Sequence, residues 1–521
     1  MSSVSSFGKL TFFSLFFIFG FLSLTKLEFL TFLYSNSIVI ICVLLLICCF
    51  SVLAFPSNIK EKALITSSIC FFITLLIFAN FSPYCTNFQY FNEYVWLNNS
   101  FLQINLMFGL DGFSIYFFVL TSFIIPICIF LEFRNSDYFF QKGFLASLLF
   151  IELALFIAFS TLDLLVFFLS FESILIPMFL MVGIFGSNKR RIKASFFFFM
   201  YSFLFSLFSL LLILYIYYVA KTTNILLLND YLFNSNQQVF AWGLMFITFS
   251  AKIPMFPFHI WLPEAHVEAP TIGSMILASL LLKLGGYGFL RFSLGLFPEG
   301  TFFFLPLIQI LAILSVLYAS FAAIYQVDLK KIVAYSSIAH MNIAILGLFS
   351  MNVPGIQGSI FTMVSHGVIS AALFLIIGIL YDRYNTRSIV YFGGICQINP
   401  ILSSFFFFFM VCNISFPGTS AFVGEFLTLV GIFSSNVFVF FTTIIGSFLC
   451  VVYSIRTFSF VCFGTIPSNL YYKFEIPVDA TREEHYSLLV FAITAIFLGV
   501  KPSLFLDFSY VTTLFLLSSY I

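Results

Sequence analysis

Charged residues are scarce in this chain, and their scarcity excludes most classes of soluble protein. Asp, Glu, Lys and Arg together make up 8% of its 521 residues, whereas soluble domains average about 25%. The formal net charge is +1, so the chain lacks the basic excess that is typical of nucleic-acid-binding proteins. We therefore expect neither a soluble protein nor a partner of nucleic acid.

Cysteines with the paired spacing of metal ligands are also lacking. None of the 10 cysteines forms a CxxC or a similar pair, so we expect no iron–sulfur or zinc site in this chain. A clear cleavage site is missing too, because the opening "MSSVSSFGKL" runs directly into an apolar stretch. This pattern predicts an uncleaved first span instead of a signal peptide.

Long apolar runs are what the sequence has in abundance. Hydrophobic residues make up 61% of it, and a bilayer core of about 30 Å takes about 20 apolar residues per helix. The runs are continuous, whereas strands of a membrane barrel alternate over about 10 residues. We therefore predict an all-α polytopic membrane protein with roughly fourteen to sixteen transmembrane helices. The predicted spans are 9–25, 29–55, 63–81, 113–132, 144–160, 163–186, 194–219, 239–260, 271–297, 302–326, 332–351, 357–381, 399–416, 418–434, 437–463 and 486–520.

Two of these assignments have alternatives. The pair of spans over 399–434 is one broken helix in the alternative interpretation, and 486–520 is one span or two, because "VKPS" interrupts it.

The 82 phenylalanines predict a lipid-facing surface and an A+T-rich coding bias, which suggests an organelle genome. Basic residues fall in alternate loops, which should all face one side, the matrix if the membrane is mitochondrial. These basic positions are Lys60, Lys62, Arg134, Lys142, 188–193, 328–331 and 382–387.

Seven ionisable residues lie far from any predicted span end. A buried charge in a membrane is costly, and it is a functional hypothesis by default. For any one of them, a structural hydrogen bond or ion pair is an equal alternative. An unbroken series over successive spans favours proton transfer. The seven residues are Glu152, Glu172, Lys252, Lys283, His340, His366 and Glu425.

Two clusters of helix breakers accompany the buried charges. The stretch "FSAKIPMFPFHIWLPEAHVEAP" holds Lys252 and four prolines, which one regular helix cannot contain. The stretch "SFPGTSAFVGEF" combines a Pro-Gly break with Glu425. Broken helices in two halves of a chain indicate an inverted-repeat transporter. The offset between them (425 − 252 = 173) also relates Lys283 to Arg456.

Longer motifs bear a family resemblance. "WLPEAHVEAP", "LLKLGGYGFLRF", "DLKKIVAYSSIAHMN", "SFESILIPM" and "FPGTSAFVGEF" resemble the subunit 4 (subunit M) family, the antiporter-like subunits of respiratory complex I. The similarity covers about 108–501. It implies two inverted five-helix repeats, each with a broken helix. The implied division is 1–143 for N-terminal helices, 144–300 for the first repeat, 301–465 for the second, and 466–521 for a C-terminal loop and transmembrane helix.

The resemblance also implies roles for the buried charges. Glu172 resembles the glutamate that pairs with the lysine of the broken helix, here Lys252, and Lys283 resembles the central lysine of a hydrophilic axis. Burial favours a neutral amine, whereas a nearby carboxylate favours the ammonium. Movement of Glu172 relative to Lys252 would therefore decide whether Lys252 holds its proton.

The second half of the axis follows from the same resemblance. His340 and His366 resemble the histidines that link the axis across the second repeat, and Glu425 resembles its terminal protonatable residue. A neutral imidazole accepts a proton on one nitrogen and donates from the other, which suits this role. Glu152 matches a glutamate of bacterial and plant members that is replaced in animals.

The implied function is that of a proton-translocating subunit without a redox centre. The family binds no cofactor in this subunit: NADH, FMN, iron–sulfur clusters and ubiquinone lie on partner subunits. The implied partners are other membrane-arm subunits, especially neighbouring antiporter-like ones, accessory subunits and lipids, in the mitochondrial inner membrane. The alternative is a subunit of a Na⁺(K⁺)/H⁺ antiporter complex. A structural linker with dead channels fits the intact set of charges poorly.

Other polar residues have a more ordinary interpretation. The glycines of "KLGGYG" lack the strand–turn–helix context of a dinucleotide site, and they indicate close helix contact. Four residues follow the first helix break: His259, Glu264, His266 and Glu268. They have two possible roles, to gate proton entry or to form structural caps and ion pairs, and we favour the structural role. Asp328, Lys330 and Lys331 indicate a matrix-side loop, with a role in coupling as the less favoured alternative. Charges expected at the membrane interface or at subunit contacts are Asp111, Asp163, Asp382, Arg383, Arg482 and Glu483.

Overall fold

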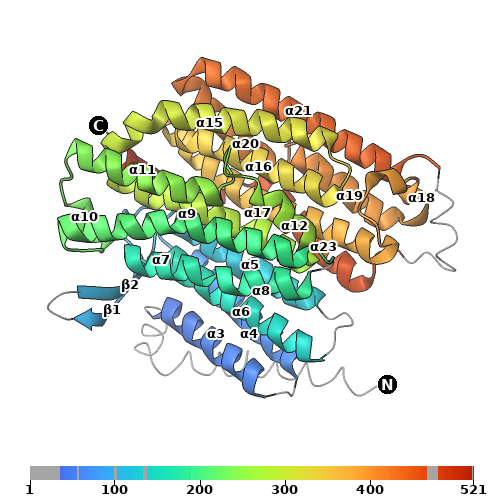
Figure 1. Cartoon of the computed structure of the whole chain (residues 1–521), viewed down its shortest axis with the longest axis horizontal. Helices are drawn as coiled ribbons and strands as arrows, with labels where there is room; N and C mark the ends of the chain where they lie inside the picture. Colours follow the sequence, from blue (N-terminus) through green and yellow to red (C-terminus); the bar gives the residue numbers. More distant parts are fainter. Residues whose placement is uncertain are drawn as a thin grey trace.

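The computed structural model of the chain describes residues 36–55, 58–98, 103–132, 138–186, 188–465, 479–518 and 520. Helices lie side by side along one common direction and form nearly all of this part (Figure 1). The predicted all-α membrane architecture is confirmed, and the predicted span 9–25 lies outside the described residues. The first helices are α3 (Ser37–Ala54), α4 (Ile59–Ala79), α5 (Ser114–Leu131), α6 (Tyr138–Ser160), α7 (Leu164–Ser173), α8 (Leu175–Phe185), α9 (Arg191–Ala220), α10 (Ile225–Asn229), α11 (Ser235–Lys252) and α12 (Trp261–Glu268). They continue with α13 (Thr271–Ile276), η1 (Leu277–Leu281), α14 (Leu282–Gly288), η2 (Phe289–Leu294), α15 (Pro298–Tyr325), α16 (Leu329–Leu348), α17 (Val353–Tyr384), η3 (Ile389–Tyr391), α18 (Ile395–Ile398), α19 (Pro400–Asn413), α20 (Ser420–Ser435), α21 (Val437–Cys462), α23 (Arg482–Val500) and α24 (Ser503–Ser518).

The number of membrane-crossing segments agrees with the prediction. Within the described residues, 12 helices are long and apolar enough to cross a bilayer. The broken helices α11/α12 and α19/α20 and the shorter α24 come in addition. The segment 486–520 is two helices, because α23 ends before Lys501 and α24 begins after Pro502. Of the two alternatives given for this segment, the structure has the one with two helices.

Among the described residues, a β-hairpin is the one sheet element, and the all-helical prediction omits it. Strands β1 (Gln89–Asn98) and β2 (Gln103–Leu110) pair antiparallel between α4 and α5. The amide of Leu162 donates to the Met107 carbonyl at 2.9 Å and ties the hairpin to the turn after α6. The hairpin lies at the left of Figure 1, beside α10. We call this side of the molecule the hairpin end.

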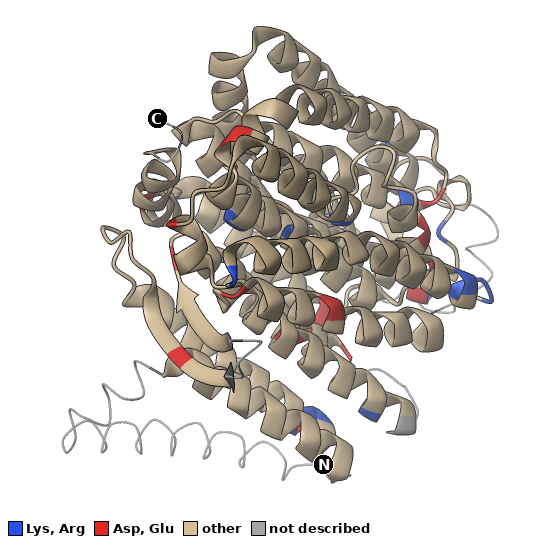
Figure 2. Cartoon of the chain, turned by 60° about the vertical axis from the view of Figure 1, so that its left-hand side comes forward, with Lys and Arg blue, Asp and Glu red and all other residues tan. Residues whose placement is uncertain are grey.

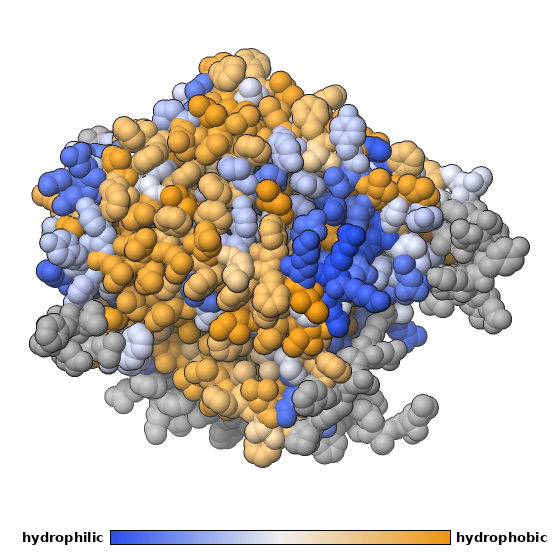
Figure 3. Space-filling view, in the orientation of Figure 1, coloured by the Kyte–Doolittle hydropathy of each residue, from blue (hydrophilic) through white to orange (hydrophobic). Residues whose placement is uncertain are grey.

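Three of the predicted basic loops, 188–193, 328–331 and 382–387, lie together at one end of the molecule, as predicted. At the end opposite the hairpin, the Lys330 ammonium donates to the Ala269 carbonyl at 2.7 Å, and the Leu329 amide donates to the Arg387 carbonyl at 3.0 Å. The loop before α9, with Lys189 and Arg190, lines a hollow at the same end. We call this the basic end. Figure 3 shows a hydrophilic patch near the start of α9.

The helices differ in how much of their surface the chain itself covers. In the most apolar stretch of α17 and of the segment 271–294, all residues are buried inside the protein, whereas only 28% of the residues are buried in the corresponding stretches of α9 and α15. Large apolar side chains point outward from the outer helices, and the face in Figure 3 is mostly hydrophobic. Charge is sparse along the ribbon in Figure 2. A surface of this kind suits lipid and neighbouring membrane subunits.

The two broken helices run in opposite directions. Four spanning segments separate α11/α12 from α19/α20, namely 271–294, α15, α16 and α17. An odd number of steps between equivalent helices inverts the second one, which is the geometry of an inverted repeat. The exact domain boundaries of the sequence analysis remain predictions.

Glycines of α14 bring two helices into close contact, as the motif "KLGGYG" predicts. A Cβ atom added at Gly285 would lie 2.6 Å from Ile253 Cγ1 and 3.1 Å from Ile253 N, just beyond the end of α11. The backbone that follows Lys252 therefore packs directly on the helix that carries Lys283.

Replacing Gly285 by Ala is expected to destabilise the assembled protein by about 1–3 kcal/mol, the usual cost of overpacking. The reason is that backbone atoms of Ile253 would have to move. The measurement is the thermal unfolding midpoint of the detergent-solubilised complex. Gly295→Ala is the matched control, because no atom lies within 4 Å of the added Cβ there. Equal midpoints for the two variants would contradict this account of the packing.

Candidate proton-transfer site

The first helix break exposes backbone carbonyls at the end of α11, and side chains satisfy them. The Trp261 indole donates to the Ala251 carbonyl at 2.8 Å, and the Asn342 amide donates to the Pro254 carbonyl at 3.3 Å. Irregular backbone at membrane depth is stable only when its polar groups find partners in protein or in a wet cavity. The predicted break after Lys252 is confirmed.

Lys252 ends α11 inside the protein, with 9% of its surface exposed. Its ammonium lies 4.2 Å from the centre of the Phe171 ring. Within the described residues, no ion pair of 4.0 Å or less joins it to Glu172, whose Oε1 has no hydrogen-bond partner there. The two groups still interact electrostatically. The predicted Glu172–Lys252 partners are therefore neighbours without a direct contact.

Lys283 lies at the centre of the molecule and is completely buried. Its ammonium donates to the Ala278 carbonyl at 2.7 Å and lies 2.8 Å from His366 Nδ1. Two π-helical segments, η1 and η2, flank the short helix α14 that carries it. Such widened turns occur frequently at functional sites. Here they coincide with the central lysine.

Two histidines continue the axis to Glu425. The His366 and His340 ring centroids are 6.0 Å apart, and His340 Nδ1 lies 2.7 Å from Glu425 Oε1. These three residues and Asn413 line a cavity with about 20 Å³ of space for the centre of a water molecule. One water needs roughly 10–15 Å³ by that measure. The structure thus brings Lys283, His366, His340 and Glu425 together in one row.

Glu152 is buried but lies apart from this row. It sits on α6 with no exposed surface, and neither carboxylate oxygen has a hydrogen-bond partner among the described residues. Its electrostatic neighbours are the thiols of Cys48, Cys70 and Cys128 on α3, α4 and α5. Glu152 therefore faces the N-terminal helices.

Of the four residues singled out after the first break, Glu264 and Glu268 line the hollow at the basic end. Glu264 forms an exposed ion pair with Lys331 at 3.2 Å, in accord with the pairing role favoured above. His266 is fully buried and stacks on Phe374 with ring centroids 4.5 Å apart. His259 packs on the ring of Tyr318 at 5.0 Å. Asp328 caps α16 through the Lys330 amide, as expected of a loop residue.

Three of the charges predicted for the interface are used inside the chain instead. Asp111 forms a buried pair with Arg291, with both guanidinium contacts at 2.8 Å. Asp163 caps α7 and accepts from the Thr223 hydroxyl at 2.7 Å. Arg383 pairs with Glu484 at 2.7 Å. Single-residue reasoning missed the side-chain partners Thr223, Glu484 and Arg291, because they are 60 to 180 residues away in sequence.

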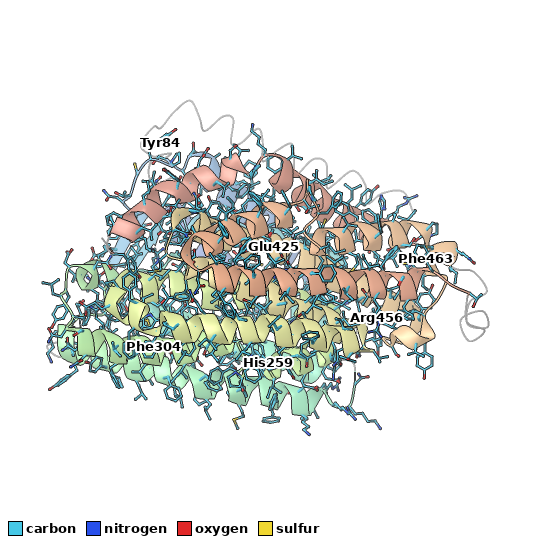
Figure 4. The ribbon with its side chains drawn as sticks, turned by 90° about the horizontal axis from the view of Figure 1, so that it is seen from above. Tyr84, His259, Phe304, Glu425, Arg456 and Phe463 are labelled. Carbon is cyan, nitrogen blue, oxygen red and sulfur yellow. The ribbon has the colours of Figure 1, made fainter. Side chains whose placement is uncertain are left out.

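Arg456, which the repeat offset relates to Lys283, lies outside the row. Its guanidinium donates to the Ile324 carbonyl at the end of α15 and is exposed. Figure 4 shows Arg456 and Glu425 on opposite sides of α21. The numerical offset does not extend to this position.

Sequence reasoning missed the polar face of α21. Cys450 contacts His340, and Asn413 at the second helix break contacts Ser454 on α21 at 3.3 Å. A signal was present, because small or polar residues recur with helical period along this helix and are buried. They are Thr443, Gly446, Cys450, Tyr453, Ser454 and Thr457.

Replacing His366 by Leu is expected to slow proton transfer at least about tenfold. The substitution removes the proton-accepting side chain that contacts Lys283, and a positioned acid–base group contributes roughly 10²–10⁴-fold to a proton transfer. The Ala278 carbonyl would still hold the ammonium. The measurement is proton uptake by vesicles that contain the assembled protein. An unchanged rate would exclude His366 from the transfer path.

Known proteins resemble this chain over most of its length. The family described as NADH:quinone oxidoreductase/Mrp antiporter, transmembrane, matches residues 161–450. NADH-ubiquinone oxidoreductase chain 4 of Marchantia polymorpha is 44% identical over 442 residues, which cover 85% of this chain and 88% of that protein. The Chondrus crispus chain 4 is 43% identical and covers 90% of this chain and 96% of that protein.

A solved structure agrees with these relatives. A chain in respiratory complex I from Thermus thermophilus with bound NADH superposes with a TM-score of 0.82 at 26% identity, and the match covers 92% of this chain and 99% of that one. The fold, the broken helices and the sequence similarity lead to the same assignment. The chain belongs to the NADH:quinone oxidoreductase/Mrp antiporter family, in the group of chain 4 subunits.

Proposed function

We propose that this chain is an antiporter-like, proton-translocating subunit in the membrane arm of an NADH:ubiquinone oxidoreductase, respiratory complex I. The observation that supports this most strongly is the buried row of Lys283, His366, His340 and Glu425, with contacts of 2.8 and 2.7 Å at its two ends. Every member binds and releases protons in water or protein. The row lies across the helix bundle instead of along one helix, so it suits lateral transfer between the two repeats.

The switch that starts transfer involves Glu172 and Lys252. With no direct contact between them in this structure, the ammonium of Lys252 rests on Phe171. Two unit charges 4 Å apart attract each other by about 4 kcal/mol at an effective dielectric constant of 20. A proton crossing the membrane works against about 2.3 kcal/mol per 100 mV. The change in electrostatic energy when Glu172 approaches Lys252 and moves away again is therefore large enough to capture and release one proton.

The row beyond Lys252 passes the proton onward. A proton released by Lys252 would reach Lys283 through water, because no contact among the described residues joins the two lysines. From Lys283 the proton moves to His366 and His340 and then to Glu425, with water bridging the two rings in the cavity between them. Glu152 is proposed as an additional proton-binding group on the side of α3 and α4.

Oxidation and reduction belong to other subunits in this proposal. NADH, FMN, iron–sulfur clusters and ubiquinone would be bound by partners, and their reactions would drive the switch from a distance. The partners proposed for the apolar outer helices are neighbouring antiporter-like subunits, accessory subunits and lipids. The proposed location is the mitochondrial inner membrane, with the basic end in the matrix, since basic loops stay on the side of synthesis or insertion.

The test is a native gel of membranes solubilised in mild detergent, stained for NADH oxidation, with mass spectrometry of peptides from the active band. We expect peptides of this chain in that band. Finding the chain only in a smaller assembly without NADH oxidation would overturn the proposal and favour a Na⁺(K⁺)/H⁺ antiporter complex. Sodium or potassium flux would then be the assay.

A further inference from the structure

The His340 imidazole is held from two sides, and one of its two partners lies outside the predicted axis. Nδ1 lies 2.7 Å from Glu425 Oε1 on α20, and Nε2 lies 3.5 Å from the Cys450 sulfur on α21. Cys450 is 5% exposed. Bulk water therefore does not compete for the Nε2 side of the ring.

The Cys450 thiol has a second place for its proton. The Tyr453 hydroxyl donates to the sulfur at 2.9 Å, and the thiol donates to the Asn413 carbonyl at 3.3 Å, where α19 ends at the second helix break. A thiol has one proton and also accepts weakly. The sulfur is thus placed between two acceptors, the Asn413 carbonyl and a bare Nε2, and it also accepts from a protonated Nε2.

We propose that Cys450 is a positioning residue that holds the His340 ring in both of its protonation states. When His340 is neutral with its proton on Nδ1 toward Glu425, the thiol donates to the bare Nε2. When His340 carries both protons, Nε2–H donates to the sulfur, and the thiol proton turns to the Asn413 carbonyl. The ring keeps a partner on both nitrogens, so it does not rotate away between proton arrivals. This inference rests on the proposed function and deepens it.

The contacts of the ring define which groups a pH measurement on His340 reports. Within the described residues, the titratable groups that face the ring or contact its partners are Glu425 from α20, His366 from α17, Cys450 and Tyr453 from α21, and Lys283 behind His366. Only Cys450 among them is absent from the predicted axis and in contact with Nε2. Removing its polar atom therefore changes one contact of His340 and leaves the row itself intact.

The experiment compares Cys450→Ala and Cys450→Ser in the assembled complex. Alanine removes the partner of Nε2 in both protonation states. The doubly protonated ring loses more than the neutral ring, because a charged N–H forms a stronger hydrogen bond than a neutral thiol does. The pH profile of coupled NADH oxidation should therefore move to lower pH by about half to one unit. Serine supplies a hydroxyl that donates and accepts, so it should restore the wild-type profile. Cys462→Ala, at a buried thiol near the end of the same helix, is the control and should change nothing.

Several results would overturn the inference. The first is a wild-type pH profile for Cys450→Ala. The second is a pH profile of Cys450→Ser that is shifted as far as that of Cys450→Ala. The third is a native gel on which Cys450→Ala fails to assemble while Cys450→Ser assembles, because the thiol would then have only a structural role. Lys252→Met, measured in the same preparation, separates this inference from the proposed function. Normal proton pumping by Lys252→Met would overturn both. Defective pumping by Lys252→Met with a wild-type Cys450→Ala profile would overturn the inference alone.

Discussion

Replacing Lys252 by Met is expected to lower coupled NADH oxidation by on the order of tenfold or more, with normal assembly. A positioned proton acceptor contributes roughly 10²–10⁴-fold to a proton transfer, and Lys252 is the proposed acceptor at the first helix break. Methionine has a similar length and packs well against aromatic rings, so it keeps the contact with Phe171. The loss should therefore come from the missing proton site and not from misfolding.

The matched control for this variant is Lys331→Met. Lys331 lies at the basic end in an exposed ion pair with Glu264, with 30% and 50% of the two side chains exposed. Such surface pairs contribute at most about 1 kcal/mol, so this variant should retain wild-type activity. Native gels should show equal amounts of complex for both variants. Equal activity of the two would exclude Lys252 from the transfer path.

Replacing Arg291 by Met is expected to destabilise the protein by about 3–5 kcal/mol, because it leaves a buried carboxylate without its partner. Arg291 makes two contacts of 2.8 Å with Asp111, and its Nε donates to the Tyr287 hydroxyl at 3.1 Å. The pair fixes η2, which follows the helix of Lys283, to the turn after the hairpin. The measurement is the thermal unfolding midpoint of the solubilised complex.

A second substitution separates the buried charge from lost packing. Adding Asp111→Leu to Arg291→Met removes the unpaired charge, so the double variant should recover most of the lost stability. If the double variant is less stable than Arg291→Met, the buried pair is not the source of the effect.

The effect of Arg291→Met should also depend on pH. Burial alone raises the pKa of Asp111, but the Arg291 charge and its hydrogen bonds outweigh burial and hold the pKa of Asp111 below its ordinary value. A depressed pKa contributes stability that is present above the unfolded pKa and is lost as the pH falls through the folded pKa. In Arg291→Met the burial remains without the Arg291 charge, so the unpaired carboxyl takes up a proton at a pH above its ordinary pKa of about 4. The stability gap between wild type and Arg291→Met should thus begin to shrink above about pH 4 as the pH falls, and shrink further where the wild-type pair itself loses its contribution.

The helix breaks and the buried charges were predictable because their signals are local. Prolines after Lys252 exclude a continuous helix whatever surrounds them, and a charge within an apolar run is visible without knowledge of its partner. The same holds for the glycines of α14, whose role requires only that another backbone approach. These features define the site residues, and the structure places Lys283, His340, His366 and Glu425 in contact or close to it.

The β-hairpin was not predictable from the same signals. In a sequence that is 61% hydrophobic, the period-2 alternation of a half-exposed strand is hard to separate from helix. The residues 89–98 do alternate in part, and the turn-forming residues Asn98, Asn99 and Ser100 follow one another in the sequence. A hairpin fits these cues, yet it lies between two predicted spans, where a loop was the default.

Long-range pairs were also out of reach. Asp111 and Arg291 are 180 residues apart, and Cys450 and His340 are 110 apart. Neither partner shows in its own neighbourhood that it has one. The absence of a direct Glu172–Lys252 contact is likewise a matter of side-chain placement, which a family resemblance does not determine.

The most direct test of the central claim is the number of protons moved per NADH oxidised. It would be measured with a pH-sensitive dye in vesicles that contain the complex with either wild-type chain or Lys252→Met, with Lys331→Met alongside. We predict a lower ratio for Lys252→Met in whatever oxidation remains, and a wild-type ratio for Lys331→Met. A wild-type ratio in fully assembled Lys252→Met complex would contradict the assignment of this chain as a proton path.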